Sequence, residues 1–380
     1  MPKARDAVAW LAGTAFAASM LYTGFALART LAFGRRRAAA GASTPSVSIL
    51  KPLHGSEPLL ADKLRSFCRQ EYPAYDVILG ARDADDPALL IAREVAAESP
   101  QHVRLAWADS ATPHHANPKV DTLAALLPHV RGEILVFADS DMLVTPEYLR
   151  AIVAPFDDLR VGAVTCLYRG RAFAPTLASR LGAMANHQQF APSVLVAAAL
   201  MGMRFGFGAT IAIRREVFDA VGGLDAIGSQ LADDARLCAL VIERGLRIEL
   251  SDYVVENLVD EPSLGALLRH ELRWARTHRA LEPAGYAGLF LTFPLALAVM
   301  YGIVTRRRCP ALIGFTAAWT MRAALAQAAV SSFGAAEREW WLIPARDLLG
   351  ALVWLAGFGS RPVRWAGEAL RIDRTGTILE

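Results

Sequence analysis

Ile134-Leu135-Val136-Phe137-Ala138-Asp139-Ser140-Asp141 is a run of five apolar residues that ends in two carboxylates. Such a short run of branched and aromatic residues is typical of a buried strand in a parallel sheet. Open α/β sheets bind ligands beyond the carboxyl ends of their strands, so Asp139 and Asp141 lie where chemistry is commonly placed. Two hard oxygen ligands there suit a divalent cation, Mn²⁺ or Mg²⁺, that also contacts phosphate oxygens. The alternative is that one aspartate caps a helix and the other is solvated.

Strand-like and helix-like segments alternate on both sides of this run. The expected strands are 47–50, 76–81, 103–107, 134–138 and 161–165, and the expected helices are 62–70, 87–97 and 120–127. This alternation over about 120 residues predicts an α/β fold with a doubly wound, mainly parallel sheet.

The composition narrows the class of protein. The 380 residues carry a formal net charge of +3, which is too small to indicate a nucleic-acid partner. The mean hydropathy of +0.28 is high for a soluble enzyme and indicates that part of the chain lies in a membrane. Four widely spaced cysteines fit neither a disulfide framework nor a zinc site, and predict buried thiols in a reducing compartment.

The N-terminal segment 7–33 is nearly free of charge, and only Arg29 interrupts it. It is long enough to cross ~30 Å of hydrocarbon as a helix, and it lacks the short apolar core of a cleaved signal peptide. The three arginines at 35–37 predict a retained anchor, residues 1–37, with its C-terminal end in the cytoplasm. Lys3 and Arg5 weigh in the opposite direction.

Three further hydrophobic segments, 287–304, 309–333 and 342–358, follow the α/β region. They predict two to three C-terminal membrane helices within 287–360, between an α/β domain at 46–286 and a tail at 361–380; the alternative is core helices of a soluble domain. Arg322 should face protein if its segment spans, and Arg346 and Asp347 weaken the third segment as a span. Pro294 and Gly302 suggest that 287–304 is re-entrant or in-plane, which would keep the arginines at 306–308 in the cytoplasm.

Three polar clusters outside the strands are candidate sites. They are Asp83-Ala84-Asp85-Asp86-Pro87, Asp233-Asp234 before the apolar helix 237–242, and His270-Glu271-Leu272-Arg273-Trp274. Each also has a simpler interpretation: a helix N-cap at Asp86, first-turn acids at 233–234, and a basic helix face at a membrane surface.

Taken in order, these motifs resemble those of nucleotide-sugar glycosyltransferases with the GT-A fold, in the ceramide glucosyltransferase family. The chain is also similar to bacterial hopanoid glycosyltransferases. The resemblance covers 47–279 and the membrane layout, and rests on the motifs at 50–55, 67–73, 83–87, 117–119, 138–141, 206–210, 222–224, 232–234 and 273–274.

The resemblance implies roles for individual residues. The family's three acidic positions fall on Asp86, Asp139 and Asp234, with Asp86 contacting the nucleotide. The family's closing motif is Gln or Arg, two residues, then Arg-Trp. Here Arg273 and Trp274 match, whereas His270 replaces the first position and, when neutral, donates a single hydrogen bond.

The expected chemistry is stabilisation of a diphosphate leaving group and activation of an acceptor alcohol. A cation on Asp139 and Asp141 would supply the first, helped by Arg273 and His270. Asp234 is the predicted general base, with Asp233 as the second choice.

Two further candidates keep two interpretations each. Lys119 is either a phosphate or nucleotide contact or a surface lysine. Trp274 packs against sugar or lipid, or belongs to the core. Because the pattern offers one general base and no second carboxylate as a nucleophile, the sequence predicts a single displacement that inverts the anomeric carbon.

The sequence therefore predicts a membrane-bound inverting glycosyltransferase. It would move glucose or N-acetylglucosamine from a UDP-sugar to the hydroxyl of a membrane lipid, either ceramide or bacteriohopanetetrol. No residue selects the lipid or the sugar. The alternatives are a processive polysaccharide synthase, disfavoured by the small C-terminal membrane region, and a non-catalytic protein that binds nucleotide-sugar or lipid. The predicted location is the cell inner membrane, multi-pass, with the catalytic domain in the cytoplasm, where nucleotide-sugars are made.

Overall fold

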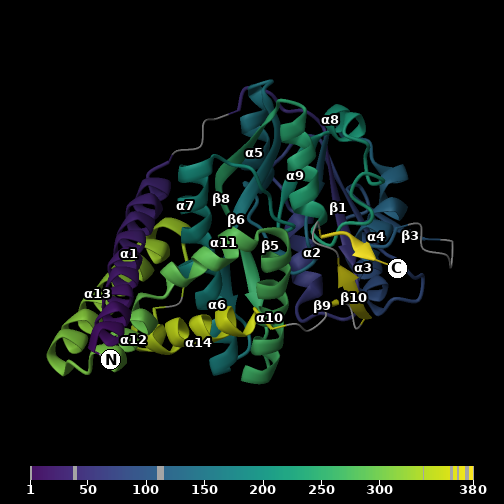
Figure 1. Cartoon of the computed structure of the whole chain (residues 1–380). Coiled ribbons are helices and arrows are strands. Elements are labelled where there is room, and N and C mark those ends of the chain that lie inside the picture. Colours follow the sequence, from purple (N-terminus) through teal and green to yellow (C-terminus); the bar gives the residue numbers. More distant parts are fainter. Residues whose placement is uncertain are drawn as a thin grey trace. The chain divides into compact units, whose positions relative to one another are not determined.

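The structure is a computed structural model that describes residues 2–36, 41–108, 115–336, 338–359, 363–365, 368–372 and 376–379. Its contacts form two compact units (Figure 1). The helical unit comprises Met1–Arg36, Arg169–Leu200 and Val259–Leu370, and the sheet unit comprises Arg37–Tyr168, Met201–Leu258 and Arg371–Glu380. These units are defined by contacts and each combines several stretches of chain. They do not test the predicted domain boundaries, which stay predictions.

The first half of the sheet is parallel, as predicted. Its strands are β1 (Val47–Leu53), β2 (Tyr75–Ala81), β3 (Val103–Trp107) and β4 (Ile134–Phe137), in the order β3-β2-β1-β4. The helices α2 (Leu60–Cys68), α3 (Pro87–Glu98) and α4 (Pro118–Leu126), the last followed by the 3₁₀ turn η1 (Leu127–His129), connect them. Each predicted strand and helix in this region exists, with ends shifted by a few residues. Parallel pairing places the carboxyl ends of β1 and β4 at the same edge.

The second half of the sheet corrects the prediction of a mainly parallel sheet. The order continues with β7 (Ile211–Arg214), β6 (Val161–Ala172), β8 (Arg247–Val259) and β5 (Met142–Leu143). Strand β7 pairs antiparallel with both β4 and β6, and β5 pairs antiparallel with β8. The alternation of strands and helices along the sequence does not specify the direction of each strand. A parallel pair needs a crossover connection, often a helix packed on the sheet, but most of the chain between β6 and β7 belongs to the helical unit.

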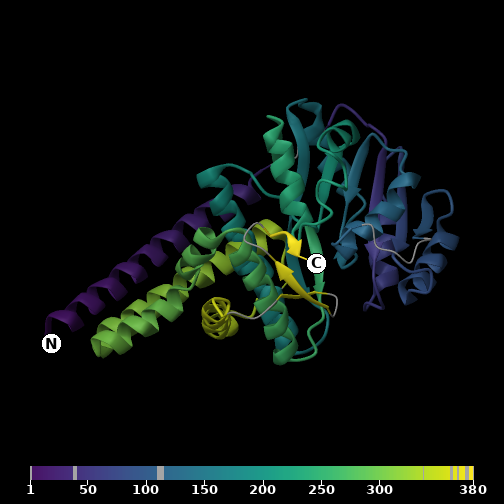
Figure 2. The same ribbon diagram turned by 45° about the vertical axis from the view of Figure 1, so that its right-hand side comes forward.

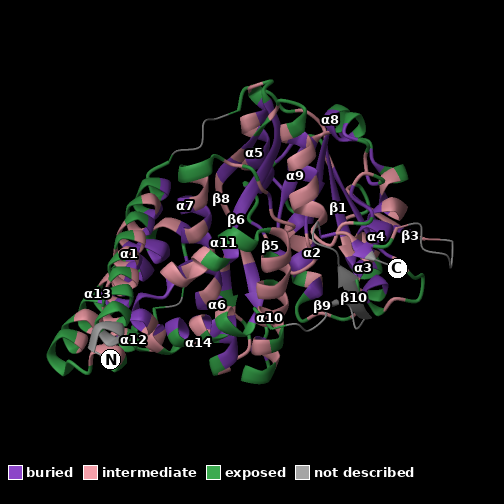
Figure 3. Ribbon diagram, viewed as in Figure 1, coloured by how far each residue is buried: buried purple, intermediate pink, exposed green. Residues whose placement is uncertain are grey.

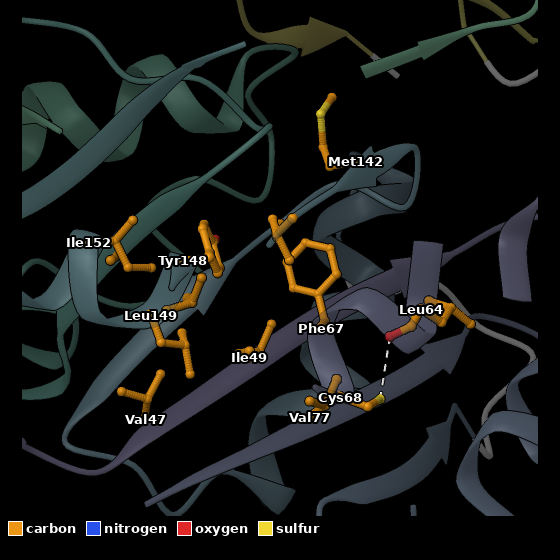
Figure 4. Packing of buried hydrophobic residues seen from close by; sticks show 14 of the residues in the cluster. Val47, Ile49, Leu64, Phe67, Cys68, Val77, Met142, Tyr148, Leu149 and Ile152 are labelled. Atoms are coloured by element: carbon orange, nitrogen blue, oxygen red, sulfur yellow. Dashed lines mark hydrogen bonds between the residues drawn. The ribbon is translucent and has the colours of Figure 1, made fainter. Parts of the chain in front are cut away.

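The strands are buried on both faces, which explains their continuous apolar sequence. On one face, Ile49, Phe67 and Tyr148 pack in a single cluster, with the two rings edge to face at 5.5 Å between centroids (Figure 4). The neighbouring residue Leu50 points to the other face and packs in a second cluster that contains Phe137. This unit also holds α5 (Tyr148–Val153), η2 (Ala154–Asp157), α8 (Arg215–Ala220) and α9 (Asp233–Glu243).

The helical unit is built around a long N-terminal helix. Its helices are α1 (Pro2–Gly34), α6 (Leu177–Ala185), the π-helical turn η3 (Asn186–Phe190), α7 (Ala191–Met201), α10 (Leu264–Leu281), α11 (Pro283–Gly288), η4 (Leu289–Thr292), α12 (Pro294–Thr305), α13 (Arg308–Phe333), η5 (Trp340–Leu342) and α14 (Ile343–Ala356). Helix α1 packs along α12 and α13 (Figure 1). Near the C-terminus, β9 (Val363–Trp365), β10 (Glu368–Ile372) and β11 (Ile378–Leu379) form a small antiparallel sheet.

Within the part of the chain that the structure describes, one helix is long and apolar enough to cross a membrane. It runs from Asp6 to Gly34, and exposed residues follow it along its length (green in Figure 3). A second candidate exists if Pro283–Thr292 and Pro294–Thr305, which are bent by 74°, count as one span; such a bend also suits a re-entrant segment. The number of C-terminal crossings therefore stays a prediction.

Two smaller sequence predictions can be checked. Arg322 is buried, and its Nη1 donates to the carbonyl of Gln188 at 2.9 Å, so it faces protein as predicted. Of the four free cysteines, Cys68, Cys166 and Cys238 are buried, whereas Cys309 is exposed at the start of α13. The prediction of buried thiols is wrong for Cys309.

Candidate active site

Asp139 and Asp141 lie in the turn between β4 and β5, at the carboxyl end of β4. The Asp139 amide donates to the carbonyl of Gly208 at 2.9 Å, which ties the turn to the loop before β7. The carboxylate of Asp139 accepts an ion pair from Lys119 Nζ at 2.8 Å. The carboxylate of Asp141 accepts a hydrogen bond from the Asn257 amide at 2.7 Å. Neither aspartate caps a helix, so the solvated-cap alternative does not describe this turn.

Three carboxylates, those of Asp139, Asp141 and Glu57, act on one another at this turn, and the charges of Lys51 and Lys63 offset part of their repulsion. Burial raises the pKa of Asp141 to about 6, and the charges of Asp139 and Glu57 raise it further. A divalent cation would relieve this repulsion, and the two carboxylates offer the hard oxygen donors that Mn²⁺ or Mg²⁺ prefers. No group of three His, Cys, Asp or Glu side chains that could hold a metal occurs among the described residues. The pair fits a cation that keeps its other positions for water and phosphate oxygens.

Asp233 and Asp234 open helix α9, where their charges also favour the helix dipole. The Gly208 amide donates to Asp234 Oδ2 at 3.0 Å, and the Ala235 amide donates to Oδ1 at 2.8 Å. Burial raises the pKa of Asp234 to about 6, and the charge of Asp233 acts in the same direction. A carboxylate with this affinity for protons suits a general base at neutral pH.

Lys119 and Gly208 bring the two pairs of carboxylates together. Lys119 Nζ lies 2.8 Å from Asp139 and 3.4 Å from Asp233. Gly208 accepts a hydrogen bond from the Asp139 amide and donates one to Asp234. A cavity beside this junction is lined by Lys119, Leu123, Phe137, Gly208, Ile211, Ile227, Asp233, Asp234 and Leu237. The Lys119 side chain is 17% exposed and is held by these carboxylates, so it belongs to the candidate site rather than to the open surface.

Asp86 caps helix α3, the simpler of its two interpretations. Its carboxylate accepts from the Ala88 amide at 2.8 Å and from the Gly55 amide at 3.0 Å, and it lies 3.4 Å from His54 Nδ1. Gly55 has a φ of 69°, a left-handed conformation that favours glycine. Asp86 thus holds the loop after β1 at the same sheet edge as the acidic turn, and its contact with a nucleotide stays a prediction.

Three supporting residues were given no role by the sequence patterns. Lys51 is fully buried in β1, donates from Nζ to the Asp139 carbonyl at 2.6 Å, and lies 3.6 Å from the centre of the Phe67 ring. Burial lowers the pKa of Lys51 to about 7, although the charges of Asp141 and Asp139 oppose the shift. The sequence signal for Lys51 was a lysine inside an apolar strand.

Glu57 and Asn257 complete this support. Glu57 accepts a hydrogen bond from Ser140 at 2.5 Å and is itself paired with Lys63 at 3.0 Å. Asn257 reaches Asp141 from strand β8. Every residue of the acidic turn from Asp139 to Asp141 is thus fixed by a contact from outside the turn, which limits the reorganisation needed to bind a ligand.

The third predicted cluster lies on helix α10 of the helical unit. His270 Nδ1 is 2.7 Å from Glu261 Oε1, and the His270 and Trp274 rings meet edge to face at 4.5 Å. Trp274 is 40% exposed, which argues against a core role. Arg273 lies on the same helix, one residue before Trp274, and its role stays a prediction.

Gly208→Ala is expected to lower transfer activity by roughly 10²-fold, an effect typical of a small displacement of catalytic groups. A Cβ at this position would lie 2.6 Å from Asp139 Oδ2 and 2.9 Å from Lys119 Nζ, so both groups must move. Steady-state kinetics on a purified variant with an unchanged thermal midpoint gives the measurement. Gly288→Ala is the matched control, because a Cβ added there would meet no described atom within 4 Å. Equal activity of the two variants would contradict the arrangement.

Comparison with known proteins gives the following matches. The profile of glycosyl transferase family 21 matches residues 11–378. Ceramide glucosyltransferase 3 of Caenorhabditis elegans is 20% identical over 354 residues, which cover 89% of this chain and 75% of the relative. Ceramide glucosyltransferase 1 of the same organism is 21% identical over 266 residues, covering 68% of this chain. That match spans about half of the relative, 54% of its length.

Among solved structures, the mannosyltransferase PcManGT from Pyrobaculum calidifontis, in complex with GDP-Man and Mn²⁺, has a TM-score of 0.51 at 21% identity. The alignment covers 93% of this chain and 100% of that structure. At this identity the similarity establishes the fold, which confirms the predicted GT-A architecture.

Proposed function

Because the chain belongs to glycosyl transferase family 21, we propose that it is a membrane-bound, inverting glycosyltransferase that moves a sugar from a UDP-sugar to the hydroxyl of a membrane lipid. The observation that carries the proposal is the junction at Lys119 and Gly208, which connects Asp139 with Asp234. Such a junction would place a cation held by Asp139 and Asp141 close to Asp234 as proton acceptor, the two functions that glycosyl transfer from a nucleoside diphosphate requires.

On the donor side, Asp139 and Asp141 would hold a divalent cation, which would neutralise charge on the leaving diphosphate. The Mn²⁺ in the complex of PcManGT supports this assignment. Lys119 carries a further positive charge next to Asp139 and would contact phosphate when the donor binds. Asp86 would contact the nucleotide, and His270, Arg273 and Trp274 of α10 would contribute phosphate and sugar contacts.

On the acceptor side, Asp234 would take the proton from the attacking hydroxyl. Its raised pKa allows it to accept that proton, and its two backbone hydrogen bonds fix its orientation. Asp233 is the weaker candidate because Lys119 engages it in an ion pair. No carboxylate is assigned as a nucleophile, so the transfer would be a single displacement that inverts the anomeric carbon.

The acceptor would be a lipid alcohol, ceramide or bacteriohopanetetrol. The names of the two nematode relatives support a sphingolipid acceptor. A β-monoglucosyldiacylglycerol synthase of Trichormus variabilis, 32% identical over 32% of this chain, supports the wider class of lipid acceptors. Helix α1 would anchor the protein in the cell inner membrane, with the sheet unit in the cytoplasm on the side of Arg35 and Arg36.

The test is transfer of radiolabelled sugar to lipid. Membranes that contain the full chain, incubated with Mn²⁺ and labelled UDP-glucose or UDP-N-acetylglucosamine, are expected to yield label in the organic extract. Mass spectrometry of that extract identifies the acceptor. Label in water-insoluble polymer would favour a processive synthase, and binding of UDP-sugar without any transfer would favour a non-catalytic protein.

A further inference from the structure

Helix α14 buries two charged residues beside Ile343 and Val353, while three of its leucines face outward. Its buried face carries the charged residues Arg346 and Asp347, which are 2% and 0% exposed. Its outward face carries Leu348, Leu352 and Leu355, which are 39%, 63% and 61% exposed. These leucines are spaced by four and three residues, so they form one continuous stripe. In water the burial of the leucines and the exposure of the charges would be favoured instead.

Two ion pairs fix this orientation. Arg346 makes two hydrogen bonds to Glu271 of α10, at 2.5 and 2.8 Å. Asp347 lies 3.2 Å from Arg322 of α13 and accepts a hydrogen bond from the Leu295 amide at 2.8 Å. A rotation that turned the leucines inward would leave these buried charges without partners, which is strongly unfavourable. The leucine stripe is therefore held outward by the fold.

The length and direction of α14 do not suit a crossing helix. Its 14 residues span about 21 Å, which is short of the ~30 Å hydrocarbon core. In Figure 2, α14 is the olive-yellow coil seen along its axis, whereas α1 runs across the same view. Both helices belong to the helical unit. If α1 crosses the membrane, α14 lies across that direction.

The surroundings of α14 match the boundary between headgroups and acyl chains. Trp341, in the turn η5 that precedes the helix, is 66% exposed. Helix α10, which packs against α14, carries Arg269, Arg273, Arg276 and Arg279. The guanidinium of Arg279 donates to the carbonyl of Phe358, just beyond the C-terminal end of α14, at 2.6 Å. Aromatic and basic residues beside an apolar stripe are characteristic of interfacial helices on anionic membranes.

We propose that α14 is an in-plane membrane helix whose leucine stripe, Leu348, Leu352 and Leu355, inserts among the acyl chains of an anionic leaflet. The inference rests on the membrane attachment in the proposed function and is independent of sugar transfer. Under this proposal, α14 lies in the leaflet that would hold a lipid acceptor, and the pair of Arg346 with Glu271 connects α14 to α10. Helix α10 carries Arg273 and Trp274, two of the proposed substrate contacts. Its ion pair with α14 would therefore keep these residues near the leaflet, which supports a lipid as the acceptor.

The test is the depth of nitroxide labels in the intact protein. Single cysteines at Leu348, Leu352 and Leu355, in a Cys309→Ser background, are labelled in the full chain reconstituted in phosphatidylcholine vesicles with one quarter phosphatidylglycerol. Accessibility to oxygen and to an aqueous nickel chelate gives the depth of each label. Asp219, exposed on α8, is the aqueous control, and Leu21, 77% exposed on α1, is the bilayer control.

We expect all three α14 labels ~5–10 Å below the phosphates, at depths that agree within a few ångström. A crossing helix would separate the labels at 348 and 355 by about 10 Å, the rise of seven residues. Chelate accessibility equal to that at Asp219 would place the stripe in water. Protection from both reagents would indicate a protein partner such as a second copy. Each of these three results overturns the proposal, and none depends on whether the protein transfers sugar.

Discussion

Asp234→Asn is expected to lower the rate of sugar transfer by about 10²–10⁴-fold, the usual contribution of a general base. The amide keeps the shape of the carboxylate and can still accept a backbone hydrogen bond, but it cannot take the proton of the acceptor hydroxyl. For the same reason, the wild-type rate should fall as the pH drops through about 6, where Asp234 becomes protonated. Steady-state kinetics between pH 5 and 8 gives both measurements.

The same variant should remain folded. Folding raises the Asp234 pKa above its unfolded value, so the ionised carboxylate costs stability once the pH exceeds the unfolded pKa. Replacement by a neutral amide removes this cost but leaves one of the two backbone amides, that of Gly208 or Ala235, without its acceptor. The two effects oppose each other, and the thermal midpoint at pH 7 should change little. Asp233→Asn is the matched control, with a smaller kinetic effect. Full transfer activity of folded Asp234→Asn protein would sink the assignment of the base.

Removal of divalent cations is expected to abolish transfer, and addition of Mn²⁺ or Mg²⁺ to restore it. Asp141→Asn should raise the Mn²⁺ concentration needed for half-maximal activity at least tenfold, because it removes one of two charged ligands. The variant should remain folded, since burial and the charges of Asp139 and Glu57 already disfavour ionised Asp141. Titration of free Mn²⁺ by electron paramagnetic resonance, in the presence of UDP, measures cation binding without catalysis.

Asp219→Asn controls for the loss of one carboxylate, because Asp219 is exposed on α8 and pairs only loosely with Arg215 at 4.0 Å. It should bind Mn²⁺ as the wild type does. Undiminished turnover in excess chelator would remove the cation from the proposed function. It would leave Lys119, with Arg273 and His270 of α10, to stabilise the diphosphate.

The sequence by itself determined the elements that are written in local patterns. The apolar run 134–138 closed by Asp139 and Asp141 predicted strand β4 and the acidic turn, because strand burial leaves a periodic signature. The Asp86-Pro87 pair likewise predicted the cap of α3. The ordered motifs also led to the correct family, to which the match over residues 11–378 assigns the chain.

The tertiary structure decided what depends on partners distant in sequence. The antiparallel half of the sheet follows from pairings such as β4 with β7, whose direction no local pattern encodes. The support of the acidic turn by Lys51, Glu57 and Asn257 depends on contacts across 83 to 116 residues. The burial of two charged residues in α14 is possible because Arg346 and Asp347 find their charged partners, Glu271 and Arg322, on other helices. A buried charge is strongly destabilising unless packing brings an opposite charge beside it. Because these partners are distant in sequence, only the folded structure identifies them.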